Sequence, residues 1–266
     1  MEMTIGQYFP GDSVIHKADP RTKLISVILY MVMVFVAKEV LSFAIVALFT
    51  ITVIAVSKVP FRCYFKGLKP ILVIMIFTSL LNLFLTGGEV IYTIPYLGWT
   101  ITDEGIKLSV FMVLRLSFLL IGTSALTFTT SPVTLTDGME ALLRPFSKVG
   151  VPSHEIAMMM TIALRFIPTF AEEADKIKKA QSARGADFSS GSLLSRAKAM
   201  IPILVPLFVG AFRRADELAT AMEARCYRGG DGRTSLKKLT FELRDYIIFA
   251  LMIILTASII LIKIFL

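Results

Sequence analysis

The sequence predicts an all-α protein that crosses the membrane about five times and carries a further set of cytosolic or interfacial helices. Hydrophobic residues make up 55% of the chain and the mean hydropathy is +0.74, whereas soluble domains are usually about 45–50% apolar. Five apolar runs approach the length of a membrane span. More than a hundred residues of mixed polarity separate the fourth run from the fifth. The sequence therefore indicates a multi-pass membrane protein with a large cytosolic segment.

The five apolar runs define the expected spans in chain order. A spanning helix needs roughly 20 residues, with about 17–25 observed. The first and third runs are shorter, and flanking residues that include snorkelling Arg21, Lys23 and Lys38 are expected to complete those crossings. Residues 24–56 would make one helix of roughly 50 Å against an apolar core of about 30 Å, so a hairpin turn is expected at residues 37–40. The runs are Leu24–Ala37, Val40–Val56, Ile71–Leu85, Leu108–Phe128 and Tyr246–Ile262.

The distribution of basic residues sets the expected sidedness. The amino-terminal segment lacks the apolar core of a signal peptide, so the amino terminus is expected to stay in the cytosol. Five crossings then place most basic residues inside, as the positive-inside rule requires, and the net charge of +8 follows from topology rather than from nucleic-acid binding. Cys63 and Cys226 are expected to be reduced cytosolic thiols. The expected inner bases are Arg21, Lys23, Lys58, Arg62, Lys66, Lys69 and those of residues 131–245, and the outer ones are Lys38, Lys107 and Lys263.

Two features belong to the outer half of the expected membrane region. Residues 86–105 are rich in glycine and aromatic residues and are expected to form an interfacial hairpin, with Tyr92, Tyr96 and Trp99 at the membrane surface. Arg115 lies inside the fourth apolar run, where a charge is costly. Two alternatives stay open for it: a contact to another span or to a partner protein, or snorkelling toward the outer surface.

Two apolar pieces interrupt the long polar segment. They are residues 156–164 and 199–212, both bounded by charged residues, and neither reaches spanning length. Pro202 and Pro206 in the second piece are expected to break or kink a helix. The second piece is therefore expected to be a re-entrant or interfacial helix on the inner leaflet rather than a further span. The expected regions are residues 1–130, with four spans, residues 131–245, on the cytosolic side, and residues 246–266, with the last span.

The polar segment contains a weak internal repeat. An offset of 41 residues aligns "ADKIKKAQSARG" with "ADELATAMEARC". Each copy predicts a helix with an apolar stripe that ends in a small-Arg-small triplet. Gly185 ends the first copy, as expected for a helix terminus, whereas the second copy has Cys226 at that place and is expected to defer glycine to Gly229 and Gly230. The triplets are Ala183, Arg184, Gly185 and Ala224, Arg225, Cys226.

Two explanations of the paired triplets stay open. An arginine in the last turn is stabilised by the helix dipole by about 0.3–1 kcal/mol, which explains a simple helix end. Alternatively, the two ends are plugs for two equivalent sockets on a partner, since small neighbours let the planar arginine tip approach a carboxylate or backbone carbonyls.

The chain resembles the transmembrane coupling subunits of energy-coupling-factor (ECF) transporters, the EcfT and cobalt-transporter permease family. The resemblance covers essentially the whole chain and rests on "HKADPRTKL" (His16–Leu24), "ALRFIP" (Ala163–Pro168) and the paired triplets. It implies that each triplet ends a coupling helix inserted into a groove of one of two ABC-type ATPase subunits, with Arg184 and Arg225 as the docking residues. Cys226 departs from the family's usual glycine.

The resemblance also implies the division of labour. The two ATPases bind ATP and Mg, and this chain has no phosphate-binding loop G-x-x-x-x-G-K-[ST] of its own. A separate small membrane protein, either one dedicated subunit or several interchangeable ones, binds the vitamin or metal ion. This chain is then a non-catalytic multi-pass subunit of the bacterial cell membrane that transmits ATP-driven movement.

The platform for the substrate-binding subunit is expected in the apolar pieces. Met158, Met159 and Met160 offer an adaptable apolar surface, although lipid-facing or core packing explains them equally well. Pro202 and Pro206 are expected points of bending.

Two other functions stay open. A conventional importer permease would carry its own substrate path, which the apolar spans disfavour. A membrane enzyme of lipid-headgroup transfer would need several aspartates at helical spacing to hold a metal ion, and only Asp187 follows Arg184 closely.

Overall fold

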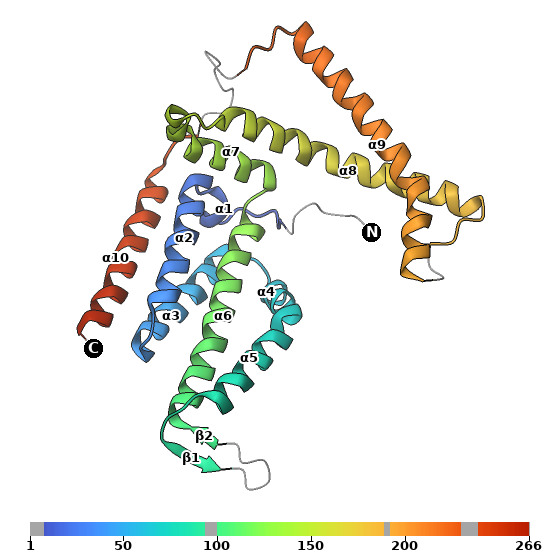
Figure 1. Cartoon of the computed structure of the whole chain (residues 1–266). Helices are drawn as coiled ribbons and strands as arrows, with labels where there is room; N and C mark the ends of the chain where they lie inside the picture. Colours follow the sequence, from blue (N-terminus) through green and yellow to red (C-terminus); the bar gives the residue numbers. More distant parts are fainter. Residues whose placement is uncertain (1–7, 94–99, 189–191, 230–238, 266) are drawn as a thin grey trace. The chain divides into compact units, whose positions relative to one another are not determined.

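The computed structural model describes residues 8–93, 100–188, 192–229 and 239–265. These residues are almost entirely helical, which confirms the all-α prediction (Figure 1). Short 3₁₀ turns, η1 (Lys69–Ile71) and η2 (Arg144–Val149), follow α4 and α7, and strand β1 (Val90–Thr93) pairs with β2 (Thr100–Thr102). The α-helices are α1 (Val14–Lys17), α2 (Pro20–Val36), α3 (Val40–Ser57), α4 (Phe61–Leu68), α5 (Leu72–Leu85), α6 (Asp103–Thr129), α7 (Pro132–Leu143), α8 (Ser153–Ala183), α9 (Leu193–Ala224) and α10 (Leu243–Phe265).

The chain divides into two compact units. The described residues of 8–138 and 239–265 form the larger one, here called the membrane unit. The described residues of 139–229 form the other, here called the arm unit because two long helices, α8 and α9, dominate it. The boundary falls within α7.

Five helical segments are long and apolar enough to cross a membrane, judged by length and composition. Four lie in the membrane unit and coincide with predicted runs: α3, the Phe61–Leu85 segment from α4 to α5, α6 and α10. The fifth is Leu194–Ala224 in α9, so residues 199–212, which were expected to form a re-entrant or interfacial helix, belong to a helix that is long and apolar enough to span, judged by length and composition. The helix is longer because it continues through the charged residues on both sides of that piece. α2 has 17 residues, the lower limit for a span, and packs beside α10, α6 and α3.

The turn between α2 and α3 lies where it was predicted. α2 ends at Val36, the amide of Ala37 donates to the carbonyl of Met33 at 3.0 Å, and α3 begins at Val40. Arg115 of α6 caps this turn from another helix, because its Nη2 donates to the carbonyl of Ala37 at 2.9 Å. Its guanidinium also lies 5.8 Å from the centroid of the Phe43 ring. The first alternative for Arg115, a contact to another span, is therefore confirmed.

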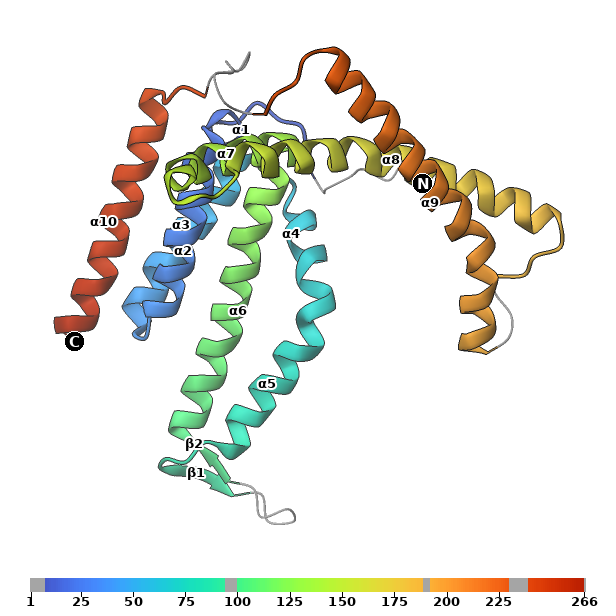
Figure 2. The ribbon, with the colours of Figure 1, turned by 45° about the horizontal axis from the view of Figure 1, so that its top comes forward.

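The core of the membrane unit lies between α2, α3, α6 and α10, which run side by side (Figures 1 and 2). Tyr30 connects three of them, since its hydroxyl hydrogen-bonds Thr50 at 2.8 Å and donates to the carbonyl of Phe118 at 3.0 Å. The ring lies directly on Gly122, where an added Cβ would overlap it. The side chains of Met33, Val34, Val46, Met252 and Ile259 are fully buried here.

The segment between α5 and α6 forms a hairpin, as predicted. β1 and β2 pair antiparallel, with Thr93 opposite Thr100. The hairpin follows α5 and leads into α6, whose first turn is capped by Thr102: its hydroxyl accepts from the amide of Gly105 at 3.1 Å. Tyr92 is exposed, whereas Tyr96 and Trp99 lie outside the described residues.

Candidate functional site

α8 and α9 of the arm unit are unusually long helices that continue through internal prolines. α8 has 31 residues and includes Pro168, and α9 has 32 residues and includes Pro202 and Pro206. Ser192 begins α9, since its hydroxyl accepts from the amide of Ser195 at 3.3 Å. Pro202 and Pro206 were expected to break or kink a helix, and α9 runs past both positions as one helix, so no break occurs. The helix does change direction along its length, as Figure 2 shows, in keeping with proline kinks.

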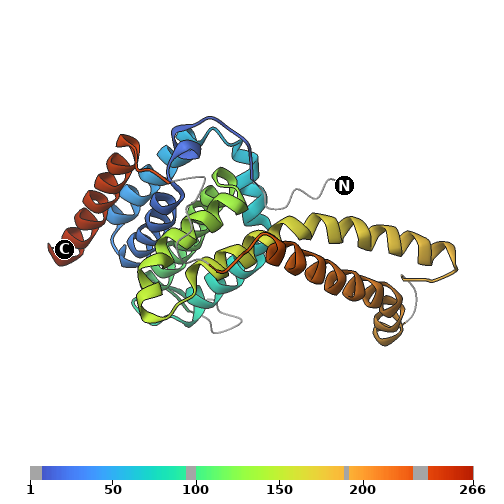
Figure 3. The same cartoon turned by 90° about the horizontal axis from the view of Figure 1, so that it is seen from above.

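The two long helices cross at equivalent positions of the sequence repeat. The crossing is visible in Figures 1 and 2, and Figure 3 shows the two helices next to each other from above. Nη2 of Arg214 lies 2.7 Å from Oε2 of Glu173, and the two positions are 41 residues apart, the offset of the repeat. The Arg214 guanidinium also lies 5.0 Å from the centroid of the Phe170 ring. Gly210 faces the same contact, because a Cβ there would lie 3.4 Å from Glu173 Oε1. The pair thus fixes the crossing.

Two arms of equal length extend beyond this crossing. Residues 174–183 follow Glu173 in α8, and residues 215–224 follow Arg214 in α9. Each stretch contains ten residues, or about 15 Å of helix. We call residues 174–184 the first arm and residues 215–225 the second arm.

The two arms end in the same backbone geometry. In the first arm, the amide of Gly185 donates to Ser182 and that of Ala186 to Gln181, both at 3.0 Å. In the second, the amide of Cys226 donates to Glu223 at 2.8 Å and that of Tyr227 to Met222 at 3.0 Å. Every donor and acceptor is shifted by the repeat offset of 41. Both ends are Schellman caps, which satisfy the last carbonyls of a helix.

Cys226 adopts the backbone conformation that glycine has in the first arm. Gly185 has φ of +89° and Cys226 has φ of +54°, both in the left-handed region. The cysteine itself therefore takes the left-handed place at the end of the second arm, where the first glycine of the sequence comes only at Gly229. A residue with a Cβ is disfavoured there by roughly 1–2 kcal/mol. The second arm keeps the cap in spite of that cost.

Both arginines sit at the tips with their side chains exposed. Arg184 and Arg225 are the cap residues of α8 and α9. Within the part of the chain that the structure describes, neither guanidinium has an ion pair or a hydrogen bond. The preceding residues, Ala183 and Ala224, are exposed and small, and nothing lies within 4 Å of a Cβ built at Gly185. Each tip therefore offers five unused N–H donors on a narrow end.

The amino-terminal "HKADPRTKL" segment forms a buried polar cluster in the membrane unit. Asp19 caps α2 by accepting a hydrogen bond from the amide of Arg21 at 2.8 Å. The Arg21 guanidinium donates two further hydrogen bonds to the same carboxylate, at 3.0 and 2.9 Å. The amide of Asp19 donates to Asp245 Oδ1 at 2.8 Å, and Asp245 Oδ2 accepts from the amide of Glu242 at 2.9 Å. The start of α2 is thus tied to the start of α10.

Lys23 ties the same helix to the end of α6. Its Nζ donates to the carbonyls of Thr129 and His16, both at 3.0 Å, and to the hydroxyl of Thr130 at 3.2 Å. The side chain is buried, and Arg21 is held by Asp19. The expectation that Arg21 and Lys23 snorkel to the membrane surface is therefore wrong, because acceptors inside the membrane unit satisfy both.

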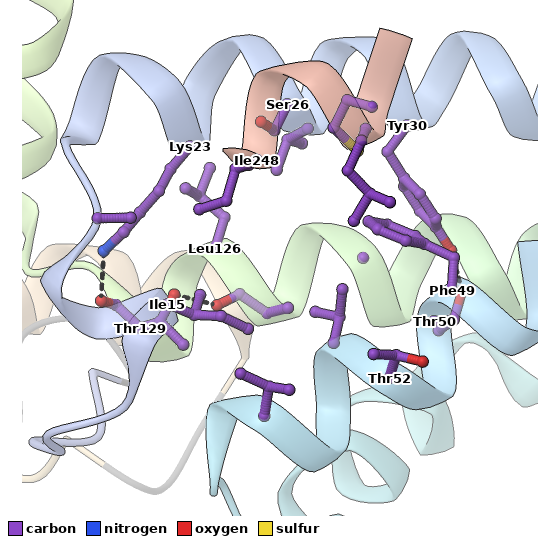
Figure 4. A pocket seen from close by; sticks show the side chains of 18 of the residues that line it. Ile15, Lys23, Ser26, Tyr30, Phe49, Thr50, Thr52, Leu126, Thr129 and Ile248 are labelled. Atoms are coloured by element: carbon purple, nitrogen blue, oxygen red, sulfur yellow. Dashed lines mark hydrogen bonds between the residues drawn. The ribbon is translucent and has the colours of Figure 1, made fainter. Parts of the chain in front are cut away.

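A cavity of about 220 Å³ lies beside Lys23 and is apolar (Figure 4). Its polar neighbours are already bonded: Lys23 to Thr129, Thr50 to the carbonyl of Val46, and Thr129 to the carbonyl of Ala125. Of the lining hydroxyls, that of Ser26 is buried without a partner among the described residues. A second cavity of about 430 Å³ lies near Lys38, Glu39, Glu104, Lys107 and Arg115 and shares no lining residue with the first. The two cavities therefore do not form one polar path along the helices.

Comparison with known proteins assigns the family. The cobalt transport protein family CbiQ matches residues 11–236. A protein from Clostridium kluyveri called energy-coupling factor transporter transmembrane protein EcfT is 57% identical over 249 residues, which cover 92% of this chain and 91% of that protein. The chain belongs to the EcfT family. Proteins of the same name from Thermosediminibacter oceani and Bacillus subtilis are 56% and 49% identical, over 92% and 96% of this chain and 91% and 96% of those proteins.

EcfT membership confirms the resemblance drawn from the sequence motifs. The chain is a multi-pass transmembrane protein of ECF transporters in the cell membrane. Both cysteines are free thiols, as predicted. Relative to the EcfT motifs, the structure brings each triplet to an exposed helix tip and places "HKADPRTKL" in the buried cluster.

The methionines and prolines predicted to face a substrate-binding subunit are spread over α8 and α9. Met158 and Met160 are half-buried, Met159 is 58% exposed, and Pro202 and Pro206 are exposed. None of them lines either of the two cavities described above. Two functional features were missed at the sequence level: the Glu173–Arg214 crossing and the Asp245 contact. The repeat offset, which pairs Glu173 with Arg214, was a signal for the first.

Proposed function

We propose that this EcfT-family chain couples two ATPase subunits to a separate membrane-embedded subunit that binds a vitamin or metal ion. In this mechanism the ATPases bind ATP and Mg and move together on binding. The sockets of the ATPases displace the two arm tips. This displacement changes the arrangement of the crossed helices α8 and α9, on which the substrate-binding subunit rests. The amino terminus lies in the cytosol, as the basic residues favour.

One observation carries the proposal: two congruent helix ends, each with an exposed arginine that lacks a partner among the described residues. A simple helix end requires neither a matched partner end nor a matched arm length. Rigid helices of about 15 Å beyond a fixed crossing are suitable levers. The ion pair between Glu173 and Arg214 joins the two arms at the crossing.

The cavity beside Lys23 favours a coupling role over a conventional permease with its own substrate path. It is lined by apolar atoms, and its lining hydroxyl and ammonium groups other than Ser26 are bonded within the described residues. A site for a polar vitamin or a metal ion needs convergent free polar groups. Among the described residues, no group of three or more His, Cys, Asp or Glu side chains is placed to hold a metal ion, which also disfavours a metal-dependent headgroup transferase.

The test is a pulldown of the coexpressed ATPase pair with the wild-type chain, Arg184→Ala, Arg225→Ala and the double variant. Membrane insertion is checked for each. The double variant is expected to insert normally and to lose the ATPases, because each tip loses its charged fork. Arg196→Ala serves as the matched control, since Arg196 is exposed on α9 far from the tip. Full retention of the ATPases by the inserted double variant, with normal uptake, would refute docking by the tips.

The methionine surface has its own test. Replacement of Met158, Met159 and Met160 with isoleucine or valine is expected to narrow the range of substrate-binding subunits that support uptake, because β-branched side chains repack less freely. Uptake with every substrate-binding subunit at the wild-type rate would assign these residues to packing or lipid contact.

A further inference from the structure

The two arms match in backbone geometry and in exposure near their tips. From residue 175 to residue 188, each side chain is exposed or half-buried in the same order as its counterpart 41 residues later. The cap hydrogen bonds and the left-handed residue match as well. The two arms therefore differ in the identity of their side chains rather than in the course of the backbone.

The charges of the arms are opposite. The first arm has four basic residues and one acidic residue, a net charge of +3, and the second has three acidic residues and one basic residue, a net charge of −2. Lys176, Lys178 and Lys179 are exposed, and none forms an ion pair within the described ranges. Their counterparts are Glu217, Ala219 and Thr220. Of the charged residues, both arms share only the arginine at the tip and the aspartate near the crossing, Asp175 and Asp216.

The acidic character of the second arm is partly offset near the crossing. Arg213 Nε lies 3.3 Å from Glu217 Oε1, but both side chains are exposed, so the pair is screened and weak. Asp216 and Glu223 are exposed and have no ion pair with any residue that the structure describes. Past the caps the signs reverse, with Asp187 opposite Arg228. The difference in charge therefore lies on the flanks of the arms. The lysines are about 8–12 Å behind the tip of the first arm, where the rim of a socket would contact them.

We propose that the two arms fit sockets of opposite charge on two non-identical ATPase subunits, so that each arm docks into one subunit only. This inference rests on the proposed coupling function. The first arm requires a socket with an acidic rim, and the second requires a basic rim around the acceptor of Arg225. Docking in the wrong order places like charges together, which is costly and selects against that arrangement. Two identical sockets would favour one arm and repel the other.

The experiment exchanges the flank charges between the arms. The exchanged variant carries Lys176→Glu, Lys178→Ala and Lys179→Thr with Glu217→Lys, Ala219→Lys and Thr220→Lys. Its total charge equals that of the wild type, whereas the first arm becomes acidic and the second basic. A photocrosslinking residue at Ala183 or Ala224, both exposed at the tips, reports which ATPase subunit each arm touches in the full complex.

In the wild type, each tip is expected to crosslink to one ATPase subunit and not to the other. In the exchanged variant, each tip is expected to crosslink to the other ATPase subunit. The inference is overturned if both wild-type tips crosslink to the same kind of subunit, or if the exchanged variant keeps the wild-type pairing. The control exchanges Ile177→Leu with Leu218→Ile, a half-buried apolar pair, and is expected to leave the pairing unchanged.

Single-arm variants decide the matter where the exchanged complex does not assemble. Changing the three lysines to glutamine is expected to weaken retention of the first subunit alone by about tenfold at low salt, and the effect should vanish near 1 M salt, where the screening length is only about 3 Å. Equal loss of both subunits, or loss of neither, overturns the charge assignment. Failure of the wild type to retain any ATPase would instead overturn the proposed function, so the two failures are distinguishable.

Discussion

Replacement of Asp245 by asparagine is expected to destabilise the membrane unit far more than its conservative chemistry implies. The Asp245 side chain is buried and accepts hydrogen bonds from the amides of Asp19 and Glu242 at 2.8 and 2.9 Å. A hydrogen bond to a charged group contributes about 1.5–3 kcal/mol, against about 0.5–1.5 kcal/mol for a neutral one. Asparagine keeps one neutral acceptor and turns an NH₂ donor toward the other amide. The expected loss is about 2–4 kcal/mol.

Thermal unfolding in detergent measures this loss. At about 2–4 °C per kcal/mol, the midpoint is expected to fall by roughly 5–15 °C. Labelling of the half-buried free thiol of Cys63 follows the unfolding, in a Cys226→Gly background that removes the exposed thiol. Asp216→Asn is the matched control, because Asp216 is exposed, and its midpoint should stay near that of the wild type. A midpoint for Asp245→Asn within 1 °C of the control (about 0.25–0.5 kcal/mol) would refute the role assigned to the buried cluster.

Two further predictions concern close packing and the crossing. Gly122→Ala is expected to lower the free energy of unfolding by about 1–3 kcal/mol, since the added methyl overlaps the Tyr30 ring. Gly67→Ala is the control and should be nearly neutral, because the atom nearest to its added Cβ lies 3.7 Å away. Equal thermal midpoints for the two variants would contradict this prediction. A double-mutant cycle with Glu173→Gln and Arg214→Met is expected to give a coupling energy of about 1 kcal/mol, because the pair is only partly buried. Strictly additive effects on stability would show that the ion pair does not fix the crossing.

The sequence predicted the elements that depend on local pattern. The runs for α3, α6 and α10 were recovered because an apolar stretch of spanning length leaves few alternatives. The turn after Val36 followed from length alone. The two arms were predicted because the repeat preserves small residues, apolar spacing and the final arginine in both copies.

The features that the sequence did not predict depend on contacts between distant residues. Lys23 was assigned to the membrane surface because its acceptors belong to other segments, Thr129 at the end of α6 among them. Pro202 and Pro206 favour either a break or a kink, and the outcome depends on the long helix on both sides, which local rules do not weigh. A left-handed cysteine is uncommon, so the sequence did not predict that Cys226 gives the second arm the cap geometry of the first.

The start of α2 has a consequence for how movement enters the membrane unit. The chain leaves this unit through Gly138, where a Cβ would lie 2.9 Å from Pro20, and re-enters it before Asp245, which is bonded to Asp19. Exit and entry therefore meet on two consecutive residues of one helix end. In the proposed mechanism, a displacement of either connection therefore acts on the same end of α2.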